Sequence, residues 1–365
     1  MNNKKVLVVG ASGLVGDAAI QQLAKSDANR VIGLSRRRPA QLPAHVAHIA
    51  LDLLDAEACR INATQLSDVT HVIYAAVNET PGDLVASWTD PKHAERNGIM
   101  FRNLLDIALV DNKNLEHIVL VHGTKAYATH LPQNRPQVPL RESLPRPPHD
   151  DFYFRQEDYL WQRQRDANWS WTVFRAPAIV GGGLGSNLNG LLAIAVFASL
   201  QKEAGLPLAF PGSADNLGVM EMVDVELLAR AIAWSTDAQS ARNQTFNMAN
   251  GDVYVWPDIW AAIADEIGIP LGAPQPISVV AAIAAQADMW KQLVARHQLN
   301  APADWKEFLG ESAALADFQL NNCGRSVLTS TIKIRQAGFH DCIDSAVSVV
   351  GWIRRWRDEK LLPPR

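Results

Sequence analysis

Two side chains in separate segments of this sequence can together polarise a carbonyl group if the fold brings them close. Lys125 follows an apolar run, within V-H-G-T-K-A-Y at 121–127, and Tyr153 lies at the predicted start of a helix, within D-F-Y-F-R-Q-E-D at 151–158. A phenol with a pKa of about 10 is a weak acid at neutral pH, but a neighbouring ammonium stabilises its anion and strengthens its hydrogen bonds. The pair is therefore a candidate donor to a carbonyl oxygen on which negative charge develops.

A glycine-rich turn near the start of the chain predicts a dinucleotide site. The first apolar run leads directly into G-A-S-G-L-V-G and then into residues with helical periodicity. In that context Gly10 permits a tight turn, Gly13 lets the backbone approach a pyrophosphate, and Gly16 lets the helix pack closely on the strand. The helix N-terminus then faces the phosphates. The predicted contacts from this turn are Gly10, Ser12, Gly13, Leu14, Val15 and Gly16.

The end of the second predicted strand favours NADPH over NADH. It reads G-L-S-R-R-R, where NAD-binding proteins usually have an acidic residue for the ribose 2′-hydroxyl. Ser35, Arg36 and Arg37 instead provide a hydroxyl and two planar cations, which suit a 2′-phosphate. The alternative interpretation is a solvated basic turn.

The elements that must position these residues alternate between strand and helix over the first 125 residues. Apolar runs predict strands and helical periodicity predicts helices. The predicted strands are 6–9, 31–34, 71–76 and 117–121, with helices at 14–24 and 96–109, and a later helix to about 167 followed by a strand at 169–177. This alternation is typical of the α/β class with a Rossmann-type, doubly wound parallel sheet.

The chain length predicts two lobes, because 365 residues exceed a typical single core. We predict an NADP-binding Rossmann lobe at 1–180 with a return segment at about 214–250. A smaller, mostly helical substrate-binding lobe takes 181–213 and 251–365. The segment 132–149 contains six prolines and separates Lys125 from Tyr153, so it is either a plain connector or a rim of the active site.

Composition excludes several classes of protein. A net charge of -4 and a pI of about 6.2 leave no broad basic face for nucleic acid. The longest apolar stretch, at 191–200, is shorter than the roughly 20 residues that span a bilayer. The apolar run at the N-terminus is also too short for a signal peptide. We therefore expect a cytoplasmic protein with no nucleic-acid or membrane partner.

Cysteine and histidine spacing predicts neither a disulfide framework nor a metal site. Cys59, Cys323 and Cys342 lie far apart, and we expect buried, inert thiols. The ten histidines show no metal-ligand motif, so no metal is expected.

Several segments together resemble the progesterone 5β-reductase/iridoid synthase-like family, a divergent branch of the extended short-chain dehydrogenases. The family pattern G-x-K-x-Y is met at 123–127, and its N-F-Y-Y-x-x-E-D is met by the segment at 151–158. T-F-N-M-A-N-G-D-V at 245–253, W-K-Q-L-V at 290–294 and the G-F pair at 338–339 extend the similarity over nearly the whole chain.

The usual short-chain pattern is absent. Ordinary short-chain dehydrogenases carry Tyr-x-x-x-Lys on one helix, where a spacing of four puts the cation beside the phenol. The nearest imitation in this chain, Tyr159 to Arg163, ends in an arginine.

The resemblance implies an NADPH-dependent 1,4-reduction of an α,β-unsaturated carbonyl, an enone or enal. Hydride reaches the β-carbon, Tyr153 stabilises the enolate, and Lys125 supports both Tyr153 and the nicotinamide ribose. Further cofactor contacts implied by the resemblance are Asp52 and Leu53 at the adenine, Ala75, Ala76 and Val77 at the ribose-phosphate, and Pro177 and Ile179. The substrate-pocket candidates are His122, Trp88, Phe308 and Phe318, the last two within a substrate-covering region at 290–320. For His122 the alternative is a structural histidine.

This sequence also departs from the family pattern. Asp151 and Phe154 replace an asparagine and a tyrosine, His122 and Thr124 replace a threonine and an arginine, and Val77 stands where plant members commonly have tryptophan. The steroid and monoterpene dialdehyde substrates of the plant members are therefore not transferred to this chain. Most of the eleven tryptophans, including Trp256 and Trp260, are interpreted as packing residues.

Two other functions stay open at this point. A sugar-nucleotide epimerase or dehydratase shares the extended fold, but the missing Tyr-x-x-x-Lys and the arginines at 36 and 37 disfavour it. A non-catalytic NADPH-sensing protein would not need Lys125 and Tyr153. The physiological substrate, the stereochemistry and the choice between monomer and homodimer are left open.

Overall fold

The computed structural model describes residues 4–80, 82–110, 112–131, 133–183, 188–212, 218–321 and 324–365. The chain divides into two compact units. The first unit comprises Met1–Pro177, Glu226–Met248 and Ser330–Asp341, and the second comprises Ala178–Val225, Ala249–Thr329 and Cys342–Arg365.

Two segments lie in a different unit from the one predicted from the sequence. The described residues 218–225 belong to the second unit because its strand β9 (Met222–Asp224) pairs with β7 (Ala178–Val180). Residues 330–341 belong to the first unit because Ser330 N–H donates to the Leu140 carbonyl at 2.8 Å and Lys333 Nζ donates to the Thr245 carbonyl at 2.9 Å. Both exchanges depend on contacts between segments far apart in the sequence.

A seven-stranded parallel sheet forms the first unit, in the order β10-β6-β5-β4-β1-β2-β3. Its strands are β1 (Lys4–Val9), β2 (Asn29–Ser35), β3 (Ala47–Ala50), β4 (His71–Tyr74), β5 (His117–Gly123), β6 (Ser170–Ala176) and β10 (Gln244–Asn247). Val6 to Val9 have no exposed surface, as expected for a central strand covered on both faces. The strand order reverses between β1 and β4, which is where ligands bind in such sheets.

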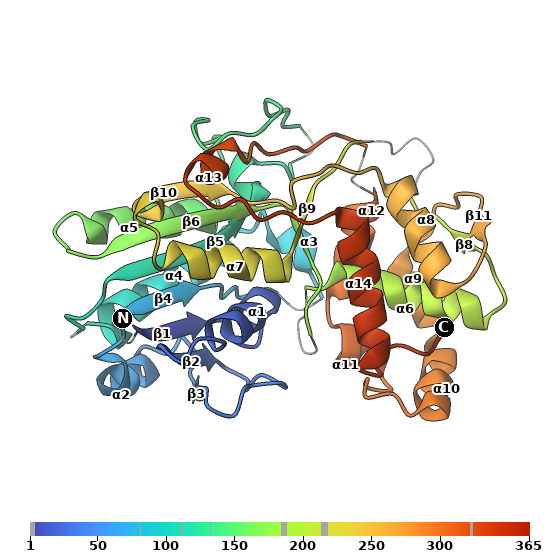
Figure 1. Cartoon of the computed structure of the whole chain (residues 1–365), viewed down its shortest axis with the longest axis horizontal. Coiled ribbons are helices and arrows are strands. Elements are labelled where there is room, and N and C mark those ends of the chain that lie inside the picture. Colours follow the sequence, from blue (N-terminus) through green and yellow to red (C-terminus); the bar gives the residue numbers. More distant parts are fainter. Residues whose placement is uncertain are drawn as a thin grey trace. The chain divides into compact units, whose positions relative to one another are not determined.

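Helices cover both faces of this sheet (Figure 1). The helices of this unit are α1 (Leu14–Leu23), α2 (Ala56–Leu66), α3 (Leu84–Ser87), α4 (Pro91–Asn103), α5 (Phe152–Gln164), α7 (Val225–Ser235) and α13 (Ile332–Gln336), with the π-helix η1 (Leu104–Ala108) and the 3-10 helices η2 (Thr124–Tyr127) and η3 (Gln239–Ala241). Leu7, Leu34 and Val173 point into one core cluster with side chains of α2, α4 and α5. Alternate residues such as Gly33 and Phe174 face the opposite side, where α1 and α7 lie.

Capping residues decide where the helices next to the candidate site begin. Asp151 accepts a hydrogen bond from Tyr153 N–H at 3.0 Å, so α5 starts at Phe152 and carries Tyr153 in its first turn. Asp90 caps α4 and Pro91 occupies its first turn, so this helix starts five residues before the predicted residue 96.

The second unit is mostly helical. Its helices are α6 (Gly190–Glu203), α8 (Trp256–Ile267), α9 (Val279–Ala285), α10 (Ala287–His297), α11 (Trp305–Leu309), α12 (Ser312–Asn321) and α14 (Ser345–Asp358), with short strands β7, β9, β8 (Leu208–Ala209) and β11 (Leu271–Gly272). Helix α6 is buried around its whole circumference from Gly190 to Gln201, and it packs against α8, α9 and α12. Trp256 and Trp260 pack in this unit at 5% and 1% exposure, which confirms their interpretation as core residues.

The cysteine prediction is only partly correct. Cys59 is buried in the core of the first unit, and burial raises the pKa of its thiol to about 11. Cys342, predicted to be buried, is exposed, and Cys323 lies outside the described residues.

Candidate functional site

The glycine turn between β1 and α1 has no room for side chains. Gly10 has φ +89°, and a Cβ there would come within 2.8 Å of the Ala75–Ala76 peptide that follows β4. A Cβ on Gly16 would collide with the carbonyl oxygen of Gly10. The turn therefore brings backbone, without side chains, to the carboxyl ends of β1 and β4.

The first turn of α1 follows this tight loop. Gly13 N–H donates to the Gly10 carbonyl at 2.9 Å, and Gly13 occupies the N-cap position without a side-chain cap. Ser12 and Val15 are half-buried, whereas Leu14 packs inward at 8% exposure. A helix N-terminus whose amides lack a side-chain cap is a favourable place for phosphate oxygens.

The arginines after β2 are exposed, and no ion pair joins them to the part of the chain that the structure describes. Ser35 is buried, and its hydroxyl donates to the Arg37 carbonyl at 2.6 Å. Ser35 therefore holds the turn that presents Arg36 and Arg37, and its hydroxyl already has a partner.

The other predicted cofactor residues follow the carboxyl ends of the neighbouring strands. Asp52, after β3, is half-buried and accepts a hydrogen bond from Leu54 N–H at 3.0 Å. The Leu53 side chain packs in the core at 3% exposure. The half-buried residues Ala75, Ala76 and Val77 directly follow β4, and Pro177 follows β6. Ile179 lies in β7 of the second unit.

Lys125 and Tyr153 meet in the first unit although they come from different elements. Lys125 lies in η2 directly after β5, and Tyr153 lies in the first turn of α5. The Lys125 Nζ is 5.4 Å from the centroid of the Tyr153 ring, 5.2 Å from that of Phe152 and 4.6 Å from that of Trp88. Three aromatic rings thus surround the ammonium and favour its positive charge. Trp88, predicted as a pocket residue, is one of these rings.

The Tyr153 hydroxyl lies against Gly123, the last residue of β5. A Cβ added at Gly123 would come within 3.2 Å of this hydroxyl oxygen. The glycine of the G-x-K-x-Y pattern thus leaves space for the phenol.

Burial dominates the acid-base behaviour of both groups. It raises the pKa of Tyr153 well above 10, with further upward contributions from the carboxylates of Asp151 and Glu79. It lowers the pKa of Lys125, against the opposing effect of the same two carboxylates. Lys125 lies over the ring face, and burial sets the direction of the phenol pKa in this structure; the acidification of the phenol by Lys125 stays a prediction. Tyr153 is therefore a neutral hydrogen-bond donor.

His122 supports the Tyr153 ring from behind. The two rings stack with centroids 4.2 Å apart and an angle of 21° between their planes. His122 Nε2 lies 3.0 Å from Gln156 Oε1, and Nδ1 faces Glu157 Oε1 at 3.5 Å. With its side chain 1% exposed and both nitrogens directed at buried groups, His122 packs behind the phenol, as a structural histidine would, and its role in a substrate pocket stays a prediction.

Glu157 is the centre of a buried polar network under this pair. Its carboxylate has no exposed surface and contacts Arg175 at 2.8 Å and Arg146 at 2.9 Å. Burial alone raises the pKa of this carboxyl, but the interactions with His122 and Arg175 outweigh it and lower the pKa to about 2. Glu157 and Gln156 therefore join α5 to β5 and β6 next to Tyr153.

Comparison with known proteins identifies the family. Residues 6–310 match the family of PRISE-like Rossmann-fold domains. The chain belongs to this family. It is 28% identical to (S)-8-oxocitronellyl enol synthase of Antirrhinum majus and 29% identical to 3-oxo-Delta(4,5)-steroid 5-beta-reductase of Arabidopsis thaliana. Each alignment covers 98% of this chain and 92% of the relative.

Solved structures share the architecture at low sequence identity. A UDP-glucose 4-epimerase matches with a TM-score of 0.69 at 14% identity, over 99% of this chain and 100% of the epimerase. The Thermus thermophilus UDP-glucose 4-epimerase, in complex with NAD, matches with a TM-score of 0.63 at 20% identity, over 96% and 99% of the two chains. At these identities the likeness concerns the fold alone.

Two further residues of the PRISE-like sequence pattern have structural roles that sequence reasoning did not assign. The Tyr127 hydroxyl donates to Asn247 Oδ1 at 2.7 Å. Asn247 Nδ2 donates to the Leu140 carbonyl at 3.0 Å, and its backbone N–H donates to Glu142 at 2.8 Å. The proline-rich segment is therefore anchored to β10 through Asn247, a contact that no local signal predicts.

Tyr159, the alternative phenol on α5, is part of a surface network. Its hydroxyl donates to Asp106, and Arg163 pairs with the same carboxylate at 3.3 Å. Tyr159 and Arg163, at the spacing of the short-chain Tyr-x-x-x-Lys motif, thus lie on one helix face and both bind Asp106.

The two phenylalanines predicted for the substrate pocket lie in the second unit. Phe308 is 3% exposed and stacks on Trp290, with ring centroids 5.4 Å apart, whereas Phe318 is half-buried on α12. Their role at a substrate stays a prediction.

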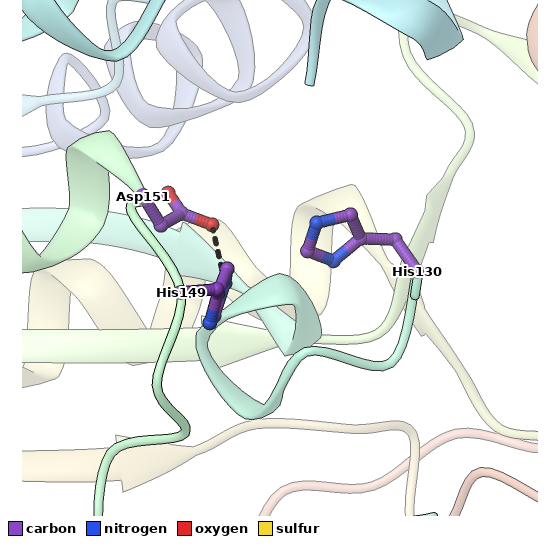
Figure 2. Close-up of side chains that lie close together, drawn as sticks. All are labelled: His130, His149 and Asp151. Atoms are coloured by element: carbon purple, nitrogen blue, oxygen red, sulfur yellow. Dashed lines mark ion pairs between the residues drawn. The ribbon is translucent and has the colours of Figure 1, made fainter. Parts of the chain in front are cut away.

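The structure also assembles a cluster that the sequence did not predict. His130, His149 and Asp151 lie close together beside the Tyr153 end of α5 (Figure 2). Their sequence spacing matches no metal-ligand motif, and only the path of the segment between 130 and 149 brings them together.

Among the described residues, no helix combines the length and the apolar character needed to cross a bilayer.

Proposed function

We propose that this chain is an NADPH-dependent reductase of activated C=C bonds, acting by 1,4-reduction of an enone or enal. The observation that carries the proposal is the meeting of Lys125 and Tyr153, with Nζ 5.4 Å from the ring centroid, at the carboxyl end of the parallel sheet. An enclosed phenol and ammonium at this end of a nucleotide-binding sheet are suited to a carbonyl substrate beside a dinucleotide.

The residues around the glycine turn fit the cofactor. The turn at Gly10, Gly13 and Gly16 carries no side chains, so a pyrophosphate could approach its backbone, and the first amides of α1 would hold the phosphate oxygens. Arg36 and Arg37 are exposed and would bind the 2′-phosphate. Bound NADPH supplies the hydride that is delivered to the β-carbon of the substrate.

The chain's own groups would then stabilise the charge that develops on the substrate oxygen. Tyr153, kept neutral by burial, donates a hydrogen bond to the carbonyl oxygen as it becomes an enolate. Lys125 adds a positive charge behind the phenol and would bind the nicotinamide ribose. His122 keeps the phenol ring in place through stacking.

The names of the relatives support this reaction class. One relative is named as an enol synthase and another as a reductase of a 3-oxo-Delta(4,5)-steroid. The first name contains the enol that 1,4-reduction generates. The second describes an oxo group next to a double bond.

The epimerase alternative receives no such support. The likeness to epimerases concerns the fold, and the phenol at the helical spacing of ordinary short-chain enzymes, Tyr159, is tied to Asp106. The proposal includes a cytoplasmic location and a small-molecule partner, and it holds for a monomer or a homodimer.

The test follows cofactor absorbance with NADPH and a panel of small enones. We expect turnover by the wild type and a loss of about 10²-fold to 10³-fold in Tyr153→Phe, the usual effect of removing one oxyanion donor. Tyr159→Phe, on the same helix, is the matched control and should keep its turnover. A weakly activated enone is the sharper substrate, since it depends more on help at the oxygen. Full activity of Tyr153→Phe on such a substrate would refute the assignment.

A further inference from the structure

The cluster of His130, His149 and Asp151 joins the two ends of the proline-rich segment. His130 precedes this segment at 132–149, His149 is its last residue, and Asp151 lies two residues further on (Figure 2). Each residue offers one ligand atom, and these atoms all lie within 4.8 Å of one another. Asp151 is 3% exposed, and the His149 side chain is 12% exposed.

The two imidazoles in this cluster have unmet hydrogen-bonding capacity. Within the described residues, all four ring nitrogens of His130 and His149 are buried without a hydrogen-bond partner. His149 Nε2 approaches Asp151 Oδ2 only to 3.6 Å, which is beyond a normal hydrogen bond. A buried polar atom without a partner costs about 1–3 kcal/mol, so two such rings facing one carboxylate call for a bound group.

We propose that His130, His149 and Asp151 bind a divalent transition-metal ion of the zinc class. Two imidazole nitrogens and one carboxylate oxygen, with water as the fourth ligand, form a tetrahedral donor set typical of zinc. Ligand atoms around such an ion lie roughly 3.3 Å apart, as follows from metal–ligand distances of about 2.0 Å.

The spacing in the structure is close to this value. His149 and Asp151, at 3.6 Å, already approach it. No separation between the ligand atoms exceeds 4.8 Å, so each has to close by at most about 1.5 Å, within reach of an imidazole side-chain rotation.

The charges around the cluster select the kind of ion. The Lys125 ammonium is close enough to affect the His130 imidazole, and it disfavours any cation there. The negative carboxylates of Asp151 and Glu79 interact favourably with the Lys125 ammonium and offset part of its positive charge. With one carboxylate and two nitrogens, the site suits an ion that prefers imidazole, whereas Mg²⁺ prefers oxygen ligands.

The site does not require Asp151 to give up its capping role. Its Oδ1 accepts from Tyr153 N–H while Oδ2 faces His149, so one carboxylate can cap α5 and bind the ion together. Occupancy would then link the start of the proline-rich segment to the start of the helix that carries Tyr153.

The test titrates the chelator-treated full chain with Zn²⁺ by calorimetry and with Co²⁺ by visible absorption. We expect one ion per chain and the Co²⁺ bands of a tetrahedral N/O site. His130→Asn and His149→Asn should each weaken binding at least tenfold. His340→Asn, a change at an exposed histidine outside the cluster, should leave it unchanged, and Mg²⁺ should not compete.

A further variant keeps the test decisive if a histidine substitution disturbs folding. Asp151→Asn keeps an oxygen to cap Tyr153 N–H but removes the charge, so it should fold and still lose at least tenfold in Zn²⁺ affinity. Absence of Zn²⁺ binding by the wild type, or equal affinity in all cluster variants, would overturn the proposal. Binding does not depend on enone reduction, so the failure of either proposal can be recognised separately.

Discussion

Replacing Arg175 by methionine tests whether the buried network below Tyr153 holds the site together. Arg175 is 7% exposed in its side chain and contacts the fully buried Glu157 carboxylate at 2.8 Å. After Arg175→Met, Glu157 keeps Arg146, whose side chain is 31% exposed and so shares its charge with solvent, and the neighbouring His122. Leaving a buried charge without its main partner typically costs about 3–5 kcal/mol.

Two further variants show whether this cost has the proposed origin. Removing both charges in Glu157→Gln/Arg175→Met should cost less than Arg175→Met alone, because no unpaired carboxylate remains. Arg163→Met breaks the pair with Asp106, at 3.3 Å, in which the side chains are 49% and 40% exposed, and should change stability by less than about 1 kcal/mol.

The assay is equilibrium urea unfolding combined with turnover on an enone. We expect Arg175→Met to lose about 3–5 kcal/mol in the free energy of unfolding. We also expect it to lose turnover in the remaining folded protein, because His122 and its partner Gln156 are anchored beside Glu157. The reasoning is refuted if Arg175→Met is as stable as Arg163→Met, or if the double variant is the least stable of all.

Three other predictions concern the cofactor, the ammonium and pH. Arg36→Ala/Arg37→Ala should raise the KM for NADPH tenfold or more and barely change that for NADH, since each phosphate contact contributes on the order of 1.5–3 kcal/mol; equal effects would contradict the assignment. Lys125→Ala should weaken both turnover and NADPH binding measured by fluorescence titration, whereas a variant of the phenol alone should lose only turnover. Because the pKa of Glu157 is lowered from 4.5 to about 2, its contribution to stability is present above pH 4.5 and lost as pH falls toward 2. Urea unfolding across this window should show a loss on the order of 3 kcal/mol that Glu157→Gln lacks.

Local patterns were sufficient for much of the nucleotide-binding half. The run at 6–9 is apolar at every position, which predicts a strand buried on both faces, and the glycines after it predict a turn that only glycine can form. Gly10, with φ +89° and the Ala75–Ala76 peptide against it, confirms this reasoning. Helix starts were less predictable. The start of α4 is set by the cap at Asp90 and by Pro91 in the first turn, and neither belongs to the apolar periodicity from which the helix was predicted.

The candidate pair of Lys125 and Tyr153 could be named from the sequence, but its electrostatics could not. The motif residues indicate that Lys125 and Tyr153 belong together. Only the packing shows that the ammonium lies over the Tyr153 ring, among Trp88 and Phe152. Only the packing also shows that the phenol is buried, which raises its pKa. The stacking of His122 on Tyr153 likewise depends on how α5 packs against β5, which the pattern of neither segment predicts by itself.

The sequence by itself determined the fold class, the glycine turn and the identity of the Lys–Tyr pair, because short local patterns with a characteristic backbone geometry are sufficient to indicate each of them. The tertiary structure decided the rest. It placed 330–341 in the first unit, assembled the Glu157 network, and brought His130 to His149 and Asp151. These features depend on contacts between residues distant in the chain, and such contacts are set by how whole elements pack and not by the pattern within any one of them.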